Sequence, residues 1–317
     1  MFAVSDRVII RTIVLPVALC LLAAACEAHD PSLLPDYVPP VGVDCDALKP
    51  LPVKIEEITG VVSDEDFAFD GEGRLVSLDS AGNVVASTRD GDVSVLSAGV
   101  TTVATGVAYL PDGDLVIADI RTDLLLRMSP NGGVEIILGD LRSPNGVEVH
   151  PDGWIYVSEQ DAGQVRRVDP DSGDFEVIMD GVPFANGISF APDYSRIYVA
   201  SYTGYSIHVQ ALDEQGMPIG EKQIWYGNIT NVDGLGVDLC GNVYFTEYVA
   251  GTLWRYDPDG LDLQKVADFP TSWIPNMDFG SGLGGWSRDR LYVNSRGQDT
   301  VWELDLGVPG RPRAYVP

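Results

Sequence analysis

Polar side chains that could bind a cation recur at one position of an internal repeat. The copies begin at residues 65, 105, 145, 186, 233 and 275, so they follow one another at intervals of 40 to 47 residues. Their first positions carry Glu65, Thr105, Asn145, Asn186, Asp233 and Pro275, with Asn276 beside the last. Carboxylate and amide oxygens are hard donors that suit Ca²⁺, Mg²⁺ or Mn²⁺. If the fold brings these positions together, Glu65, Asn145, Asn186 and Asp233 predict an oxygen-lined site for one divalent cation.

A second interpretation of the same residues needs no metal. Asn and Asp also cap strand entries and satisfy loop backbone groups. Without a cation, however, Glu65 and Asp233 would repel each other and their pKa values would rise. Three of the donors stand directly before a glycine at the same repeat position, which favours a shared site. His29, His150 and His208 show no metal-binding spacing, and the sequence has no nucleophile-elbow serine, phosphate loop or helical zinc motif.

The repeat itself predicts the elements that position these residues. Each copy alternates apolar with small or polar residues, as in a half-buried strand, and Asp112-Gly113 and Asp152-Gly153 are hairpin turns. Further strands are expected at Leu115–Ala118, Ile155–Ser158, Val243–Thr246, Gln164–Val168, Ser206–Gln210, Thr252–Tyr256, Val134–Leu138 and Phe175–Met179. Four strands in about 40 residues are typical of a propeller blade. We therefore predict an all-β, six-bladed β-propeller with four antiparallel strands per blade around a central channel.

Ring closure and the cysteines follow from this topology. Val53–Ile58 precedes the first copy and should complete blade six from outside, although the tail at Arg313–Val316 competes for that position. If the inner strands start at the upper face, their first turns lie at the lower face. Cys240 would then meet Cys45 there and form a disulfide. The alternative to this disulfide is that Cys45 and Cys240 are two unrelated free thiols.

The channel should be lined in layers. The first residue of each inner strand projects into it, and two positions further along each strand an apolar ring follows below: Phe67, Val107, Val147, Ile188, Leu235 and Met277. Trp225, Trp273 and Trp286 are candidates for lining a pocket at the upper face. The alternative is that these side chains only contribute to packing.

The N-terminal sequence predicts that the protein is exported from the cytoplasm. Arg7 and Arg11 precede an apolar run that ends in small residues before Cys26, which is the layout of a signal peptide over residues 1–25. Cys26 is expected to carry lipid and to anchor the protein in the bacterial cell envelope, facing the periplasm or the cell surface; ordinary cleavage nearby is the alternative. Residues 26–52 would be a linker and residues 53–317 the propeller.

The net charge of the chain limits the classes of partner that it can bind. The formal net charge is −27, and removal of residues 1–25 leaves 18 basic and 46 acidic residues, or −28. Such an acidic surface repels phosphate backbones, so nucleic acid is excluded as a partner.

Three motifs resemble those of the senescence-marker-protein/gluconolactonase family: Ser143–Gly146, Ala185–Phe190 and Val232–Asp238. The sequence is similar, more distantly, to paraoxonases and strictosidine-synthase-like proteins. The resemblance implies that Glu65, Asn186 and Asp233 hold a divalent cation, with Ca²⁺ expected and Mg²⁺, Mn²⁺ or Zn²⁺ as alternatives. Glu65 is followed by Asp66-Phe67, where the family has Gly-Pro.

The resemblance further implies hydrolysis of a small lactone or ester. Asp233 would act as general base, and Asn145 would orient or stabilise the carbonyl oxygen as a second catalytic residue. Thr105, Asn145 and Asn276 are the expected substrate-binding residues. The rival hypotheses are a non-catalytic, lipid-tethered binding platform and a metal-independent, strictosidine-synthase-like enzyme.

Overall fold

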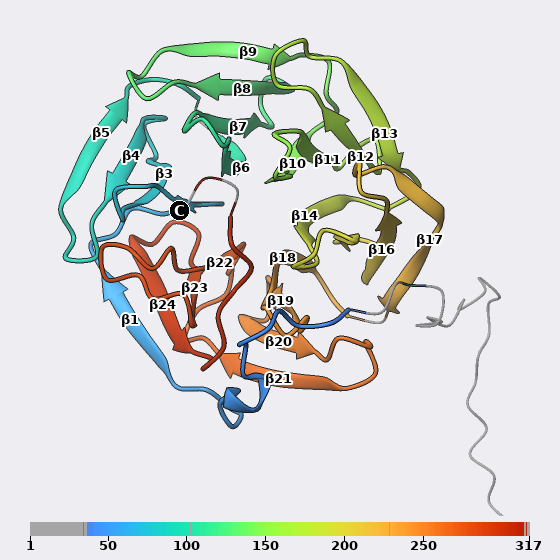
Figure 1. The fold of residues 1–317 in the computed structure, drawn as a ribbon. Coiled ribbons are helices and arrows are strands. Elements are labelled where there is room, and N and C mark those ends of the chain that lie inside the picture. Colours follow the sequence, from blue (N-terminus) through green and yellow to red (C-terminus); the bar gives the residue numbers. More distant parts are fainter. Residues whose placement is uncertain (1–33, 35–36, 102, 228, 314, 316–317) are drawn as a thin grey trace, which may run out of the picture.

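The chain forms six four-stranded antiparallel sheets arranged in a ring (Figure 1). This computed structural model describes Leu34, residues 37–101, 103–227, 229–313 and Tyr315. The predicted signal peptide and Cys26 lie outside these residues. The prediction of an all-β, six-bladed β-propeller is confirmed. Across the described ranges, no helix is long and apolar enough to cross a membrane.

The first three blades follow the chain from inside to outside. Blade one contains β2 (Ala68–Phe69), β3 (Leu75–Leu78), β4 (Val84–Ser87) and β5 (Val93–Ser97). Blade two contains β6 (Ala104–Tyr109), β7 (Leu115–Asp119), β8 (Leu124–Met128) and β9 (Val134–Leu138). Blade three contains β10 (Pro144–Val149), β11 (Ile155–Glu159), β12 (Gln164–Val168) and β13 (Phe175–Met179).

The remaining blades repeat this order, and the last one takes its outer strand from the N-terminal side. Blade four contains β14 (Ala185–Phe190), β15 (Arg196–Ser201), β16 (Ser206–Leu212) and β17 (Pro218–Gly227). Blade five contains β18 (Val232–Val237), β19 (Val243–Glu247), β20 (Thr252–Tyr256) and β21 (Leu263–Asp268). Blade six contains β22 (Met277–Phe279), β23 (Arg290–Asn294), β24 (Thr300–Asp305) and β1 (Ile55–Thr59).

The ring closes where β1 pairs with β24, as expected for Val53–Ile58. The pairing is antiparallel and runs from Ile55 opposite Leu304 to Thr59 opposite Thr300. β1 therefore occupies the position for which Arg313–Val316 was the competing candidate. Closure in this way covers the edge that β24 would otherwise expose to other chains.

Apolar side chains fill the spaces between blades. The described residues form six hydrophobic clusters, one at each interface between neighbouring blades. The interface between blades one and six, for example, packs Phe69 against Trp286 and Tyr292, with ring centroids 5.2 and 5.6 Å apart. Each blade is therefore buried on both faces, whereas outer strands such as β5 and β9 stay exposed along much of their length.

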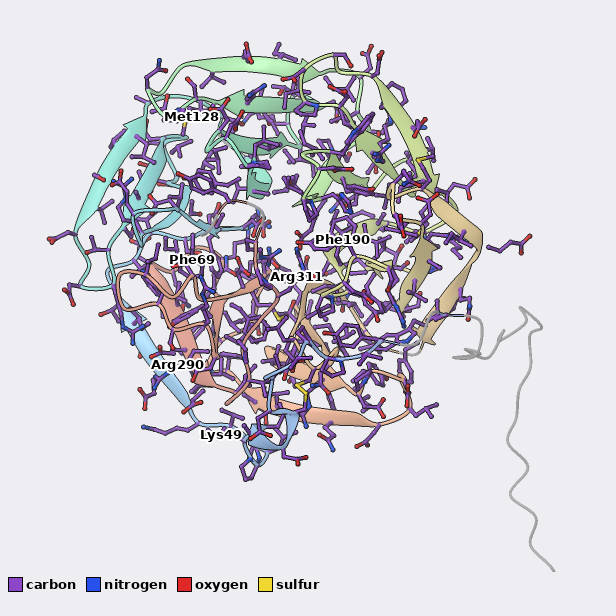
Figure 2. All side chains as sticks on the ribbon, in the orientation of Figure 1. Lys49, Phe69, Met128, Phe190, Arg290 and Arg311 are labelled. Atoms are coloured by element: carbon purple, nitrogen blue, oxygen red, sulfur yellow. A yellow bond between two sulfur atoms is a disulfide. The ribbon has the colours of Figure 1, made fainter. Side chains whose placement is uncertain are left out.

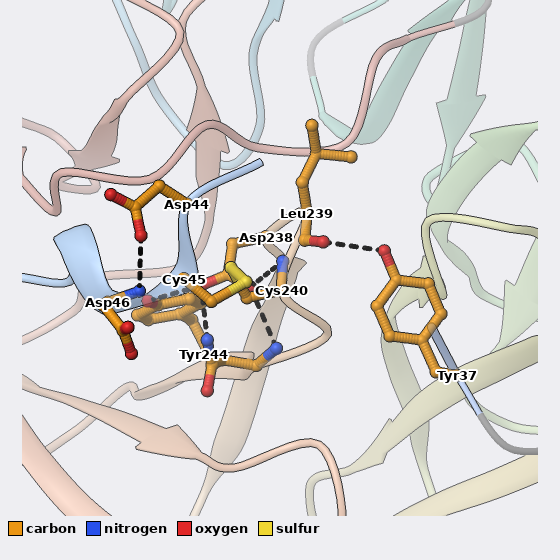
Figure 3. The surroundings of a disulfide bond; sticks show 9 residues. Tyr37, Asp44, Cys45, Asp46, Asp238, Leu239, Cys240 and Tyr244 are labelled. Carbon is orange, nitrogen blue, oxygen red and sulfur yellow. Dashed lines mark hydrogen bonds between the residues drawn. A yellow bond between two sulfur atoms is a disulfide. The ribbon is translucent and has the colours of Figure 1, made fainter. Parts of the chain in front are cut away.

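The predicted disulfide is present between Cys45 and Cys240 (Figure 3). Cys45 begins a short 3₁₀ turn, Cys45–Ala47, and Cys240 lies in the first turn of blade five. Residues 43–55 pack their apolar side chains on the cluster between blades five and six. Tyr37 donates a 2.7 Å hydrogen bond to the Leu239 carbonyl beside the disulfide. The described part of the expected linker is therefore attached to the lower face.

The C-terminal segment turns toward the axis of the ring after β24. It runs over the centre in Figure 1, and Arg311 lies near the middle of the ring in Figure 2, whereas Lys49 and Arg290 lie toward its edge. Arg311 is 5% exposed, and the ring of Tyr315 stacks on Tyr109 at 4.9 Å. This segment consequently forms the lower end of the central channel.

Candidate functional site

A cavity of about 350 Å³ occupies the centre of the propeller. Its lining includes every first position of the repeat: Glu65, Thr105, Asn145, Asn186, Asp233, Pro275 and Asn276. The lining also includes the whole apolar ring predicted below them. The sequence thus identified both layers of the channel. None of the tryptophans lines this cavity: Trp225 and Trp286 are buried between blades, and Trp273 is 56% exposed.

A β-bulge places the polar residue of each middle blade. In β10, Pro144 pairs with Glu159 and Val147 with Val157, so Asn145 and Gly146 together face a single residue of β11. The same shift occurs in β14 around Asn186 and in β18 around Asp233. A bulge adds a residue to one strand and redirects its side chain. The bulge is therefore the local reason that these side chains line the channel.

A left-handed residue precedes each of these bulges by two positions. Ser143, Phe184 and Asn231 have φ values of 53°, 53° and 51°, and Trp273, with a φ of 66°, holds the same place two residues before Pro275 in blade six. Non-glycine residues rarely adopt this conformation, and such strain tends to be kept where function requires it. Here it turns the incoming loop so that the second residue after it enters the channel.

The glycine after each bulged residue allows neighbouring inner strands to approach closely. A Cβ atom on Gly146 would lie 2.9 Å from the Asn186 carbonyl oxygen, and one on Gly187 would collide with the carbonyl of Asp233. The Asn-Gly and Asp-Gly pairs of the repeat thus have a steric cause. They hold adjacent blades in backbone contact around the site.

Hydroxyl groups from the second strands satisfy the bulged backbone. The Ser158 hydroxyl accepts from Gly146 N–H at 2.9 Å and donates to the Asn186 carbonyl at 2.5 Å. The Thr246 hydroxyl accepts from Gly234 N–H at 2.9 Å in blade five. Both side chains are fully buried. Sequence reasoning missed them, although they occupy matching positions in the repeat.

Glu65 and Asp233 form the acidic part of the upper layer. Burial raises the pKa of Glu65 to about 7, although the charge of Arg296 opposes this shift. Burial, and then the negative charge of Glu65, raises the pKa of Asp233 well above its usual value. Two carboxylates in one buried site do not both ionise easily unless a cation lies between them. The repulsion expected from the sequence is thus present.

Asn186 contributes an oxygen that has no partner. Its side chain is 3% exposed, and its amide forms a hydrogen bond with Asp233. The Oδ1 atom of Asn186 is buried without a hydrogen bond. A buried acceptor of this kind costs free energy unless a ligand satisfies it. It therefore identifies a position for a donor group or a cation beside Asp233.

These three residues fit a hard divalent cation by their chemistry. Glu65, Asn186 and Asp233 together offer two carboxylates and one amide oxygen, which is the donor type that Ca²⁺ and Mg²⁺ prefer. Within the described parts of the chain, no three His, Cys, Asp or Glu side chains cluster as a metal site by themselves. The Asn186 oxygen is consequently essential to the proposed ligand set.

The expected substrate-binding residues differ in which of their side-chain groups remain available to contact a substrate. The Thr105 hydroxyl donates to the Pro144 carbonyl at 2.7 Å, so its oxygen remains available as an acceptor. The Asn276 amide donates to Asp66. Asn145 lines the cavity from within its bulge. Asn145 thus lies where a substrate carbonyl could be contacted.

Asp66 is the main difference from the family pattern at blade one. Its carboxylate accepts from the backbone N–H of Phe67 and Val107, both at 2.7 Å. These bonds replace ladder pairing at the start of blade one, and β2 is only two residues long. Burial raises the pKa of Asp66 to about 7. Asp66 therefore joins the inner strands of blades one and two through its side chain.

Arg296 and an aromatic group complete the upper end of the cavity. Arg296 lies between β23 and β24, forms an ion pair with Glu65 and lies 3.5 Å from the Tyr248 hydroxyl. The ring of Phe184 lies tilted against that of Tyr202, with centroids 5.5 Å apart, and the Tyr202 ring lies 6.2 Å from that of Tyr248. Sequence reasoning missed these loop residues, because their types differ from one copy of the repeat to the next.

The lower end of the cavity contains a second charged group. Glu148 pairs with Arg311 at 2.7 Å and with Arg313, which also contacts Asp278. Burial opposes ionisation of Glu148, but the two arginines outweigh it and hold its pKa below the ordinary value. The apolar ring separates this group from the polar upper layer.

Comparison with known proteins agrees with this architecture. Residues 143–297 match the SMP-30/gluconolactonase/LRE-like region. The predicted family resemblance is confirmed. The pentonolactonase XacC of Haloferax volcanii is 26% identical over 246 residues, which cover 66% of this chain and 82% of that protein. A gluconolactonase of Zymomonas mobilis is 24% identical over 206 residues, covering 55% of this chain and 57% of the relative.

Solved structures show the same fold. A gluconolactonase from Xanthomonas campestris aligns with a TM-score of 0.66 at 20% identity, covering 87% of this chain and 98% of that one. The calcium-binding protein regucalcin from Agrobacterium tumefaciens aligns with a TM-score of 0.67 at 20% identity, covering 81% and 94%. At these identities the likeness concerns the fold alone.

Proposed function

We propose that this protein is a lactonase-type hydrolase of a small lactone or ester. The pentonolactonase and gluconolactonase relatives support this reaction class. We further propose that Glu65, Asn186 and Asp233 hold one divalent cation, with Ca²⁺ the expected ion. The observation that carries the site is the buried, unpartnered Oδ1 of Asn186 beside Asp233.

A bound cation would polarise the substrate carbonyl and lower the pKa of a water molecule. The protein's own residues supply the remaining functions. A carboxylate oxygen of Asp233 would accept the proton of the attacking water, since this group lines the cavity. The Asn145 amide donates to the carbonyl oxygen as negative charge develops on it. Phe184 and Tyr202 add aromatic side chains to the lining of the cavity.

The test combines metal analysis with turnover. Protein lacking residues 1–26 is purified, its bound metal is measured by mass spectrometry, and a panel of lactones is assayed with and without chelator. Asp233→Asn should lower kcat/KM by at least about 100-fold, the usual contribution of a general base. Asp112→Asn is the matched control, because Asp112 lies in an exposed turn of blade two and its side chain is 54% exposed.

The outcomes separate the competing hypotheses. Stoichiometric metal with chelator-sensitive turnover supports the hydrolase. Turnover that chelator does not change would indicate the metal-independent enzyme. Bound metal without turnover on any lactone would favour a binding platform in which the cation has a structural role.

We also propose that the protein is exported and lipid-anchored through Cys26. The support is the signal-like sequence of residues 1–25 and the Cys45–Cys240 disulfide, since disulfides persist in oxidising compartments outside the cytosol.

A further inference from the structure

Arg296 occupies an unusual place for a cation in a candidate metal site. It comes from the loop between β23 and β24 of blade six and forms an ion pair with the Glu65 carboxylate. Its side chain is 42% exposed, whereas that of Glu65 is 14% exposed. The guanidinium thus reaches into the upper end of the cavity from the solvent side.

A second arginine lines the cavity, but it lies at the lower end and does not pair with Glu65. Arg313 lines the lower end and contacts Glu148 and Asp278. At the upper end, Arg296 is therefore the cationic side chain of the described lining that balances Glu65 and Asp233. Its positive charge opposes the rise that burial causes in the pKa of each of these two carboxyl groups.

A divalent cation and a guanidinium on one carboxylate repel each other. This repulsion is strong at short range because the site is partly shielded from water. Binding of the cation must either displace Arg296 from Glu65 or proceed against its charge. The Nη1 atom that pairs with Glu65 also donates to the Tyr248 hydroxyl at 3.5 Å, and this contact can remain when the pair with Glu65 is broken.

We propose that Arg296 is a resident counter-cation that competes with the divalent cation for Glu65 and sets the metal affinity of the site. Without metal it neutralises Glu65. With metal it moves to the rim. This inference deepens the proposed function and rests on its cation site.

The experiment is calorimetric titration of Ca²⁺ into chelator-treated protein, with no substrate present. Arg296→Gln keeps hydrogen-bond donors but removes the charge, so its Kd for Ca²⁺ should fall by about tenfold. Arg296→Lys keeps the charge and should stay within about threefold of the wild-type Kd. Arg290→Gln is the control, because Arg290 is also in blade six, is 35% exposed and pairs with Glu303 away from the cavity.

Each outcome of the Ca²⁺ titration either supports or overturns the proposed competition. A tighter Kd in Arg296→Gln alone, or Ca²⁺ binding that appears only in that variant, supports the competition. An equal or weaker Kd in Arg296→Gln overturns it while leaving the cation site intact. Equal tightening in Arg290→Gln would assign the effect to net charge and also overturn it. If no variant binds Ca²⁺, the cation site of the proposed function fails, and this inference fails with it.

Discussion

The buried charges at the lower end of the channel make a quantitative prediction. Glu148 is 4% exposed and pairs with Arg311, which is 5% exposed, and with Arg313. Glu148→Gln keeps the shape but leaves two guanidinium groups with Asp278 as their remaining anion. Removing one partner of a buried ion pair costs about 3–5 kcal/mol. We expect the free energy of unfolding to fall by that amount.

The assay is equilibrium unfolding in urea, followed by tryptophan fluorescence. Glu56→Gln is the matched control, because Glu56 pairs with Lys54 at 3.0 Å while the two side chains are 53% and 82% exposed. An exposed pair of this kind contributes at most about 1 kcal/mol. If both variants lose less than about 1 kcal/mol, the lower charged group does not stabilise the propeller and the reasoning is wrong.

The dependence on pH gives an independent check. The folded-state pKa of Glu148 is depressed, so its ionised form stabilises the fold above the ordinary glutamate pKa of 4.5. That stabilisation is lost as the pH falls through the depressed folded-state pKa. The stability difference between wild type and Glu148→Gln should thus be full near neutral pH and shrink in acid. A difference that grew in acid would contradict the assigned sign.

Two further predictions concern the N-terminal region. The disulfide closes a loop with a sequence separation of 195 residues, so Cys45→Ser with Cys240→Ser should lower stability by about 5 kcal/mol in thermal or urea unfolding; an unchanged midpoint would show that the packed segment suffices alone. Cys26→Ser, expressed from the full sequence in bacteria, should move the protein from the membrane to the soluble fraction, because one acylated residue would provide the anchor; continued membrane association would argue against lipidation.

The fold and the upper layer of the site were predictable because the repeat carries both. A fixed position in each copy must occupy a fixed place in each blade, so Asn145, Asn186 and Asp233 line one cavity although they are far apart in sequence. The disulfide was predictable for the same reason, since blade topology puts Cys240 at the lower face.

The remaining parts of the site lie outside the repeat. Arg296 belongs to a loop, and its contact with Glu65 depends on ring closure rather than on local pattern. Arg311 and Arg313 follow the last blade, and the residue they share, Glu148, is 163 and 165 positions away. The tail therefore looked like a candidate strand, whereas its arginines are needed to neutralise buried carboxylates.

The glycines of the repeat have a consequence for how this scaffold can change. Gly146 and Gly187 hold neighbouring inner strands together through backbone atoms alone, so the spacing of the ring does not depend on the side chains that line it. A replacement at Thr105 or Asn145 would alter the lining of the cavity while the proposed cation ligands keep their positions. A larger residue at either glycine would instead separate two blades and displace two site residues at once. Redesign for new substrates should consequently vary the bulged side chains and leave the glycines unchanged.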